Sequence, residues 1–268
     1  MKSENFILND YFKRIGFKGQ AKTDLATLTN LMRCHLFSIP FENIDVQKNR
    51  FVSLKPEDIV SKIIYSQRGG YCYEVNGIFA MALTAIGFKY QFCGARPMFY
   101  PTLRPKTHVV LVVDIADEKF ICDLAFGSFG IRAPISLNQL NQTIQQDYDQ
   151  FELSKLDPDT YLIKAKIENE WKNQFCFDLY PMQWIDMTLP NYFNSTHPDT
   201  IFVQKLLVVK HNPDGRSILL DNQLKRYVKG QIEISEINRG NIPAILKNEF
   251  GIDYPDLPSF PKGSSDFE

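Results

Sequence analysis

The sequence predicts an α+β protein built from three consecutive parts. Up to residue 88 the apolar residues recur with a helical period, and from Tyr90 onward they alternate with a period of two, as in strands. After residue 190 a strand pattern is followed by a final helix. We therefore expect a helical domain over residues 1–88, an antiparallel β-domain (sandwich or barrel) over 89–190, and an α/β domain over 191–268.

Four helices are expected in the first domain. A short one ends within residues 16–19, which contain two glycines, and Asp24 is a suitable N-cap for a second that stops before Pro40. Pro56 opens the third. The fourth runs from Cys72 to about Ile86 and is followed by a glycine at its C-terminal end.

Strands dominate the rest of the chain. Residues 137–151 are rich in Gln and show no clear period, so we expect a surface stretch there, and residues 189–198 are expected to form turns. The tail, 255–268, is expected to be mobile. The expected strands are 90–95, 107–115, 119–124, 161–167, 174–180, 205–211, 216–221 and 224–229, and the last helix is 243–250.

Composition excludes several classes of protein. The net charge is -1 with no basic block, so no nucleic-acid surface is expected, and no apolar run is long enough to span a membrane. The first residues lack the pattern of a signal peptide. The five cysteines are odd in number, scattered and without a C-x-x-C pair, which argues against disulfides and against a metal site. These features are typical of a cytosolic protein.

Cys72 lies where a helix is expected to begin. Gly69 and Gly70 precede it, and at a helix N-terminus the unpaired N–H groups favour a thiolate, the form that attacks carbonyl groups. An inert buried cysteine is the alternative, since free Cys is often buried. Upstream, Glu42 stands among apolar residues and needs a partner, for which Arg68 is the candidate in a structural ion pair.

His108 and Asp123 are the candidates for a base and for the group that orients it. His108 begins the most apolar strand, and Asp123 is an acidic residue within the next one. A two-residue turn at Asp117-Glu118 would place them on one face but four residues out of register, roughly 13 Å apart. Spacing alone therefore does not establish a catalytic triad.

Four motifs, in this order and spacing, resemble those of the arylamine N-acetyltransferases. They are SIPFEN (residues 38–43), RGGYCYEVNG (68–77), THVVLVV (107–113) and DLAFG (123–127), and the opening YFKRIGF (11–17) also matches. The resemblance covers about residues 10–135. It implies a fold similar to the papain-like cysteine proteinases, with an N-terminal helical bundle, a central β-barrel and a C-terminal α/β lid.

The resemblance implies a Cys72–His108–Asp123 triad and a ping-pong reaction through an acetyl-cysteine. The acetyl group would pass from the cosubstrate acetyl-CoA to an arylamine or arylhydrazine; no metal, nucleic-acid or membrane partner is implied, and the oligomeric state is left open. Ala125 stands where the family usually has glycine, which leaves the acyl-chain range open. Expected contacts are Phe41, Tyr71 and Phe126 for the amine and, on the family's loop positions, Arg104, Thr107 and Gly127 for CoA.

Two other functions use the same residues. A papain-like or transglutaminase-like amidase would resolve the acyl-enzyme with water in place of an amine. A binding module that has kept the fold without the chemistry is the third possibility, although it would have no need of a buried Asp beside a His.

Overall fold

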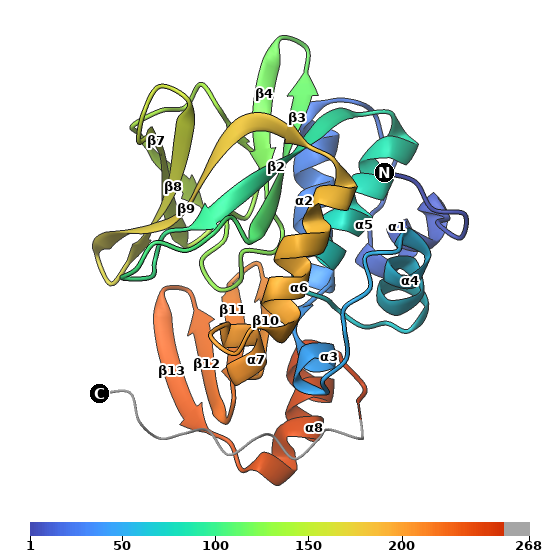
Figure 1. The fold of residues 1–268 in the computed structure, drawn as a ribbon, viewed down its shortest axis with the longest axis vertical. Coiled ribbons are helices and arrows are strands. Elements are labelled where there is room, and N and C mark those ends of the chain that lie inside the picture. The colour runs from blue at the N-terminus through green and yellow to red at the C-terminus, as the bar shows by residue number, and fades with distance from the viewer. Residues whose placement is uncertain (255–268) are drawn as a thin grey trace.

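A computed structural model describes residues 1–254. Two antiparallel sheets and a group of helices make up the fold, so the α+β prediction is confirmed (Figure 1). The predicted tail, residues 255–268, lies outside the described residues. No helix in the described part of the chain is long and apolar enough to cross a membrane.

Four of the first five helices, all but a short one over residues 44–47, agree with the sequence prediction because their caps are strong local signals. Asp24 accepts a hydrogen bond from the Thr27 N–H, 2.8 Å away, and Gly16 adopts the left-handed conformation that ends the first helix. These helices are α1 (Leu8–Ile15), α2 (Leu25–Ser38), α3 (Ile44–Gln47), α4 (Pro56–Val60) with the π turn Ser61–Tyr65, and α5 (Cys72–Ile86).

The larger sheet has eight antiparallel strands and curls into a half-barrel where a barrel was expected, and α5 packs beside its strands β2 and β3 (Figure 1). Its order is β5-β4-β3-β2-β9-β8-β7-β6. The strands are β2 (Lys89–Pro97), β3 (His108–Ile115), β4 (Glu118–Cys122), β5 (Ile135–Ser136), β6 (Thr143–Gln146), β7 (Asp149–Lys155), β8 (Thr160–Ile167) and β9 (Glu170–Met182).

The smaller sheet joins distant parts of the chain. Its order is β1-β10-β11-β12-β13, in which β1 (Phe41–Glu42) pairs with β10 (Leu207–Asn212). One face packs on the last helical segment through the apolar cluster of Leu219, Leu224 and Leu246. The remaining strands are β11 (Gly215–Leu220), β12 (Gln223–Val228) and β13 (Gln231–Glu236), and the helical segment comprises Arg239–Asn241, α8 (Ile242–Ile245) and the π turn Leu246–Phe250.

Several segments differ from the sequence prediction. Residues 189–198, expected to be turns, lie mostly in helix α6 (Thr188–Thr196), which continues from the 3-10 turn Trp184–Met187 and is followed by α7 (Ile201–Gln204). The Gln-rich stretch forms a hairpin, β6–β7, and β13 was not expected. A proline is tolerated in the first turn of a helix, so Pro190 does not prevent α6 from forming.

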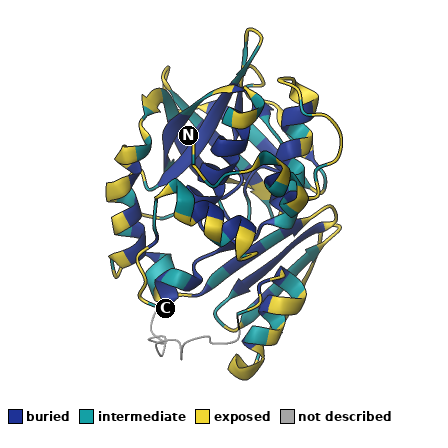
Figure 2. Cartoon of the chain, turned by 90° about the vertical axis from the view of Figure 1, so that its right-hand side faces the viewer, coloured by how far each residue is buried: buried dark blue, intermediate teal, exposed yellow. Residues whose placement is uncertain are grey.

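The main core lies between the helices and the curled sheet. Helix α5 is buried along most of its length, with Ile78, Phe79 and Leu83 fully covered. Buried residues gather in the interior of the molecule, and exposed ones follow the outer faces and loops (Figure 2). The core thus holds α5, and with it Cys72, against strand β3 of the larger sheet.

Candidate active site

The N-terminus of α5 is fixed by close backbone contacts. A Cβ on Gly69 would lie 2.0 Å from the Pro40 carbonyl oxygen, and one on Gly70 would lie 2.7 Å from the Glu74 side chain. Both positions therefore exclude any larger residue. Glu74 accepts a hydrogen bond from the Tyr71 N–H at 3.1 Å, as the glutamate of a capping box does, immediately beside Cys72.

A buried cluster of charged side chains holds the turn that precedes α5. Arg68 donates from Nε and Nη2 to one oxygen of Glu42, at 2.9 and 2.6 Å, so the predicted structural pair is confirmed. Lys62 contacts Asp45 and Glu74 at 2.6 and 2.7 Å and lies 3.8 Å from Glu42. Three carboxylates share two cations, and burial raises the pKa of Glu74 to about 7.

Cys72 is 3 % exposed and lies on the wall of a cavity of about 790 Å³. Burial, assisted by the nearby charge of Asp123, raises the pKa of its thiol well above the ordinary value, although the backbone N–H groups of Tyr73 and Cys72 act in the lowering direction. The helix terminus alone therefore does not produce the expected thiolate. A proton acceptor beside the sulfur is needed.

His108 and Asp123 are in direct contact. His108 Nε2 lies 2.7 Å from Asp123 Oδ2, and Asp123 is fully buried. His108 lines the same cavity as Cys72. Its other ring nitrogen, Nδ1, forms no hydrogen bond within residues 1–254 and is not among the buried unpaired atoms.

The register of the β3–β4 hairpin explains this contact. Ile115 pairs with Glu118, so the turn is at Ala116-Asp117, one residue earlier than predicted. Continuing the register places Asp123 two residues from His108, about 7 Å along the strand, and the side chains close that gap. The prediction of a four-residue offset was wrong because it misplaced the turn.

Asn76 is a site residue that the sequence motif contained but did not identify. From the second turn of α5, its Nδ2 donates to Asp123 Oδ1 (3.1 Å) and to the Val109 carbonyl (2.8 Å), and its Oδ1 accepts from the Leu124 N–H (3.1 Å). One amide thus ties the helix to both strands. No local pattern indicates such partners.

Two of the three residues predicted to contact the amine line the cavity, and the third does not. Phe41 and Phe126 line it, and the Phe126 ring packs against the His108 imidazole with centroids 5.1 Å apart. Tyr71 does not line it; the side chain is fully buried, and its hydroxyl donates to Asn191. Tyr71 therefore lies in the core, as an N-cap residue held by α6.

The residues predicted to contact CoA all line the cavity. Arg104 lies over the ring of Tyr100, 4.7 Å from its centroid, and its Nε is buried without a partner among the described residues. The Thr107 carbonyl accepts hydrogen bonds from Tyr73 and Asn194. Gly127 has a φ of +97°, a conformation that glycine adopts without strain.

Ala125, the departure from the family motif, fits its position. It has no positive φ, and its N–H donates to Asp123 Oδ1 at 3.0 Å. The methyl group occupies the cavity wall without straining the backbone. The third part of the chain also contributes to the cavity lining, through Phe202, Ile218 and Tyr227, which no sequence pattern indicated.

The other three histidines lie outside the contact between His108 and Asp123. His35 is buried against Tyr11, His197 is in a surface loop, and His211 is buried beside Arg132. Among residues 1–254 no group of His, Cys, Asp or Glu is arranged to hold a metal ion.

Comparisons with known proteins agree along almost the whole chain. A family model described as N-acetyltransferase matches residues 24–256. The chain is 32% identical over 256 residues to "Arylamine N-acetyltransferase / N-hydroxyarylamine O-acetyltransferase" of Salmonella typhimurium, covering 93% of this chain and 90% of that protein. It is 32% identical to the arylamine N-acetyltransferase of Escherichia coli over 260 residues, with the same coverage.

Solved structures give the same result for the fold. The arylamine N-acetyltransferase from Salmonella typhimurium superposes with a TM-score of 0.88 at 29% identity, covering 98% of this chain and 97% of that one. The Mycobacterium marinum arylamine N-acetyltransferase in complex with CoA superposes with a TM-score of 0.88 at 27% identity, covering 94% and 95%.

Proposed function

The chain belongs to the arylamine N-acetyltransferase family, and we propose that it transfers an acetyl group from acetyl-CoA to an arylamine or arylhydrazine through an acetyl-Cys72 intermediate. One observation carries this proposal. Cys72 and His108 line one cavity, and His108 is held by a buried carboxylate 2.7 Å from its ring.

The first half-reaction forms the acetyl-enzyme. His108 Nδ1 takes the proton of the Cys72 thiol, and the sulfur attacks the thioester carbonyl carbon of acetyl-CoA. Backbone N–H groups at the start of α5 face the developing oxyanion. The tetrahedral intermediate collapses with cleavage of the bond to the CoA sulfur, which leaves with the proton from His108.

The second half-reaction transfers the acetyl group to nitrogen. An arylamine is neutral at pH 7, so its nitrogen lone pair can attack acetyl-Cys72. His108 accepts the amine proton and returns it to the Cys72 sulfur as the bond breaks. Asp123 keeps the imidazole in one orientation and stabilises its charged form, as in other triads.

The cavity walls suit both substrates. Phe41 and Phe126 offer flat apolar surfaces to the aromatic ring of the acceptor. Arg104, whose Nε lacks a partner among the described residues, offers charge to the phosphates of CoA, and Thr107 and Gly127 offer backbone contacts. Tyr71 is left out of the proposed acceptor site because it does not line the cavity.

The proposal also includes a structural relationship to other cysteine enzymes and a cellular location. The nucleophile on a helix and the His and Asp on a neighbouring sheet are the arrangement of papain-like cysteine enzymes, and the proposed division at residue 88 separates these two contributions. The five free thiols within the described residues suit the reducing cytosol.

An intact mass measurement tests the proposal. With acetyl-CoA and no amine, the protein should gain the mass of one acetyl group, and Cys72→Ala should gain none. An added arylamine should then remove the acetyl group and appear as its N-acetyl product. Steady release of CoA without any amine would favour the hydrolase, and the absence of any acetylation would overturn the transferase.

A further inference from the structure

The loop from Leu124 to Ile131 forms one wall of the cavity and is fixed at both ends. At its start, Asn76 and Asp123 accept the N–H groups of Leu124 and Ala125. At its end, Gln146 Oε1 accepts the N–H groups of Arg132 and Ala133, at 2.6 and 3.1 Å. The middle of the loop, which includes Gly127 and Ser128, lines the cavity.

His211 reaches this middle section from the smaller sheet. It is buried at the end of β10, and its Nε2 lies 3.2 Å from the Gly127 carbonyl oxygen. Among the described residues, no other element hydrogen-bonds to residues 126–131. A residue of the third part of the chain thus holds a loop of the second.

The tautomer of His211 is set by its neighbours. Its Nδ1 lies 3.5 Å from Arg132 Nη1, and a guanidinium can only donate, so Nδ1 is the acceptor and Nε2 carries the hydrogen. Burial, with the charges of Arg216 and Arg132, lowers the pKa of His211 to about 3. The ring is therefore neutral at working pH, and Nε2 donates to Gly127.

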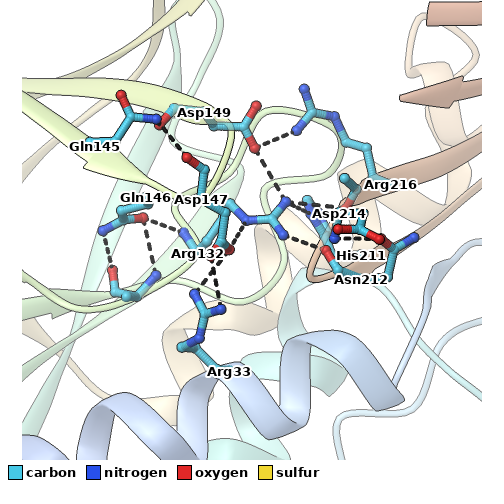
Figure 3. A network of polar contacts seen from close by, with 12 residues as sticks. Arg33, Arg132, Gln145, Gln146, Asp147, Asp149, His211, Asn212, Asp214 and Arg216 are labelled. Atoms are coloured by element: carbon cyan, nitrogen blue, oxygen red, sulfur yellow. Dashed lines mark hydrogen bonds and ion pairs between the residues drawn. The ribbon is translucent and has the colours of Figure 1, made fainter. Parts of the chain in front are cut away.

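Arg132 is itself held rigidly (Figure 3). Its side chain is fully buried and contacts Asp147 and Asp149 at 2.8 and 3.2 Å, while it donates to the carbonyls of Asn212 and Gly215. Asp147 also binds Arg33 of α2 through two hydrogen bonds, which Figure 3 shows below Arg132. The donor direction of His211 is thus fixed from three parts of the chain.

We propose that His211 is a positioning residue: by holding the Gly127–Ser128 peptide, it determines how the acetyl donor binds. In a planar trans peptide the N–H of Ser128 points opposite the Gly127 carbonyl, hence away from His211. The left-handed φ of Gly127 allows this orientation. This inference rests on the proposed function and adds to it a residue outside the triad.

Three variants of His211 separate the effect of its hydrogen bond from the effect of its side-chain volume. His211→Phe keeps a ring but cannot donate; His211→Gln places an N–H near the Nε2 position, whereas the shorter side chain of His211→Asn does not reach Gly127. We expect the Kd for CoA, measured by calorimetry, to rise about tenfold in the Phe and Asn variants, as for the loss of one buried hydrogen bond. In the Gln variant it should stay within about threefold of wild type.

Kinetics give a second readout. In a ping-pong reaction, kcat/KM for acetyl-CoA reports the first half-reaction alone, so it should fall about tenfold while kcat/KM for the amine changes less than about twofold. The rate at which iodoacetamide labels Cys72 should not change. His35→Phe is the matched control, because His35 is also buried with one hydrogen bond but does not line the cavity. It should lower Tm and leave CoA binding unaltered.

Two results would overturn the inference. One is a Kd for CoA in His211→Phe that equals the wild-type value, and the other is a Gln variant that binds CoA as weakly as the Asn variant. If the Phe variant does not fold, the comparison of Gln with Asn decides. Failure of the proposed function is distinct from both, since it would appear as wild-type protein that acetyl-CoA does not acetylate.

Discussion

Replacing Asp123 by Asn tests the proposed triad at the atom that orients the base. Asp123 Oδ1 accepts from two donors that cannot reverse, the Ala125 N–H and the Asn76 amide, at 3.0 and 3.1 Å. Oδ2 accepts from His108 Nε2 at 2.7 Å. Because Asn has a single oxygen, that oxygen should take the Oδ1 position and leave its NH₂ group facing His108.

The imidazole must then accept at Nε2, and its hydrogen moves to Nδ1. That is the atom proposed to receive the proton of Cys72, so the base is blocked while the fold is retained. We expect the rate of Cys72 acetylation to fall by about 10⁴, which corresponds to about 5.5 kcal/mol in the barrier. The same exchange of tautomer gives a loss of that size in serine proteases.

Rapid-quench mixing with acetyl-CoA, read by intact mass, measures this rate directly. Asp114→Asn is the control, since Asp114 lies on the same hairpin but is only half-buried and forms its ion pair with Lys119, away from His108. It should acetylate at the wild-type rate. Acetylation of Asp123→Asn within about tenfold of wild type, with an unchanged Tm, would refute the assignment of Asp123 and the tautomer argument together.

The charged cluster under α5 gives two further predictions. Arg68→Met should cost about 3 kcal/mol in urea unfolding, because it leaves the buried Glu42 with Lys62 3.8 Å away, and adding Glu42→Gln should recover part of the loss; a cost below about 1 kcal/mol would contradict it. Since the folded-state pKa of Glu74 is raised to about 7, the contribution of Glu74 to the free energy of unfolding should fall as pH rises from about 4.5 to 7. Relative to wild type, Glu74→Gln should therefore gain about 2 kcal/mol between pH 5 and 8; a pH-independent difference would exclude this.

Local sequence signals predicted those elements whose ends are marked by glycine, proline or a capping residue. Helix α5 runs from Cys72 to Ile86 as expected, because two glycines precede its start and Gly87 ends it with a φ of +102°. The same reliance on local signals led residues 189–198 to be predicted as turns rather than as helix α6. Pro190 and several Asn and Ser residues are turn formers in isolation, and only packing on the core makes that segment helical.

The candidate site shows the same limit. Cys72, His108 and Asp123 were selected from their residue types and order, whereas the contact between the last two depended on a hairpin register that a shift of one residue in the turn changes. Partners such as Asn76 and His211 act through side chains that meet residues 47 and 84 positions away. Sequence pattern carries no information at that range, because such contacts exist only once the sheets have formed.

The pairing of β1 with β10 has a consequence for how the protein is made. Glu42 lies opposite Val208, so apart from a single bridge to Gly70 the strand that precedes the Cys72 helix has no partner strand until β10 has been synthesised. Contacts between such distant residues form slowly, and a nascent chain meanwhile exposes an unpaired apolar edge at Phe41. Because Phe41 also lines the cavity, together with Leu207 of β10, the substrate cavity is completed only after β10 has been synthesised. Fragments that end before β10 should therefore aggregate rather than accumulate as partly active enzyme.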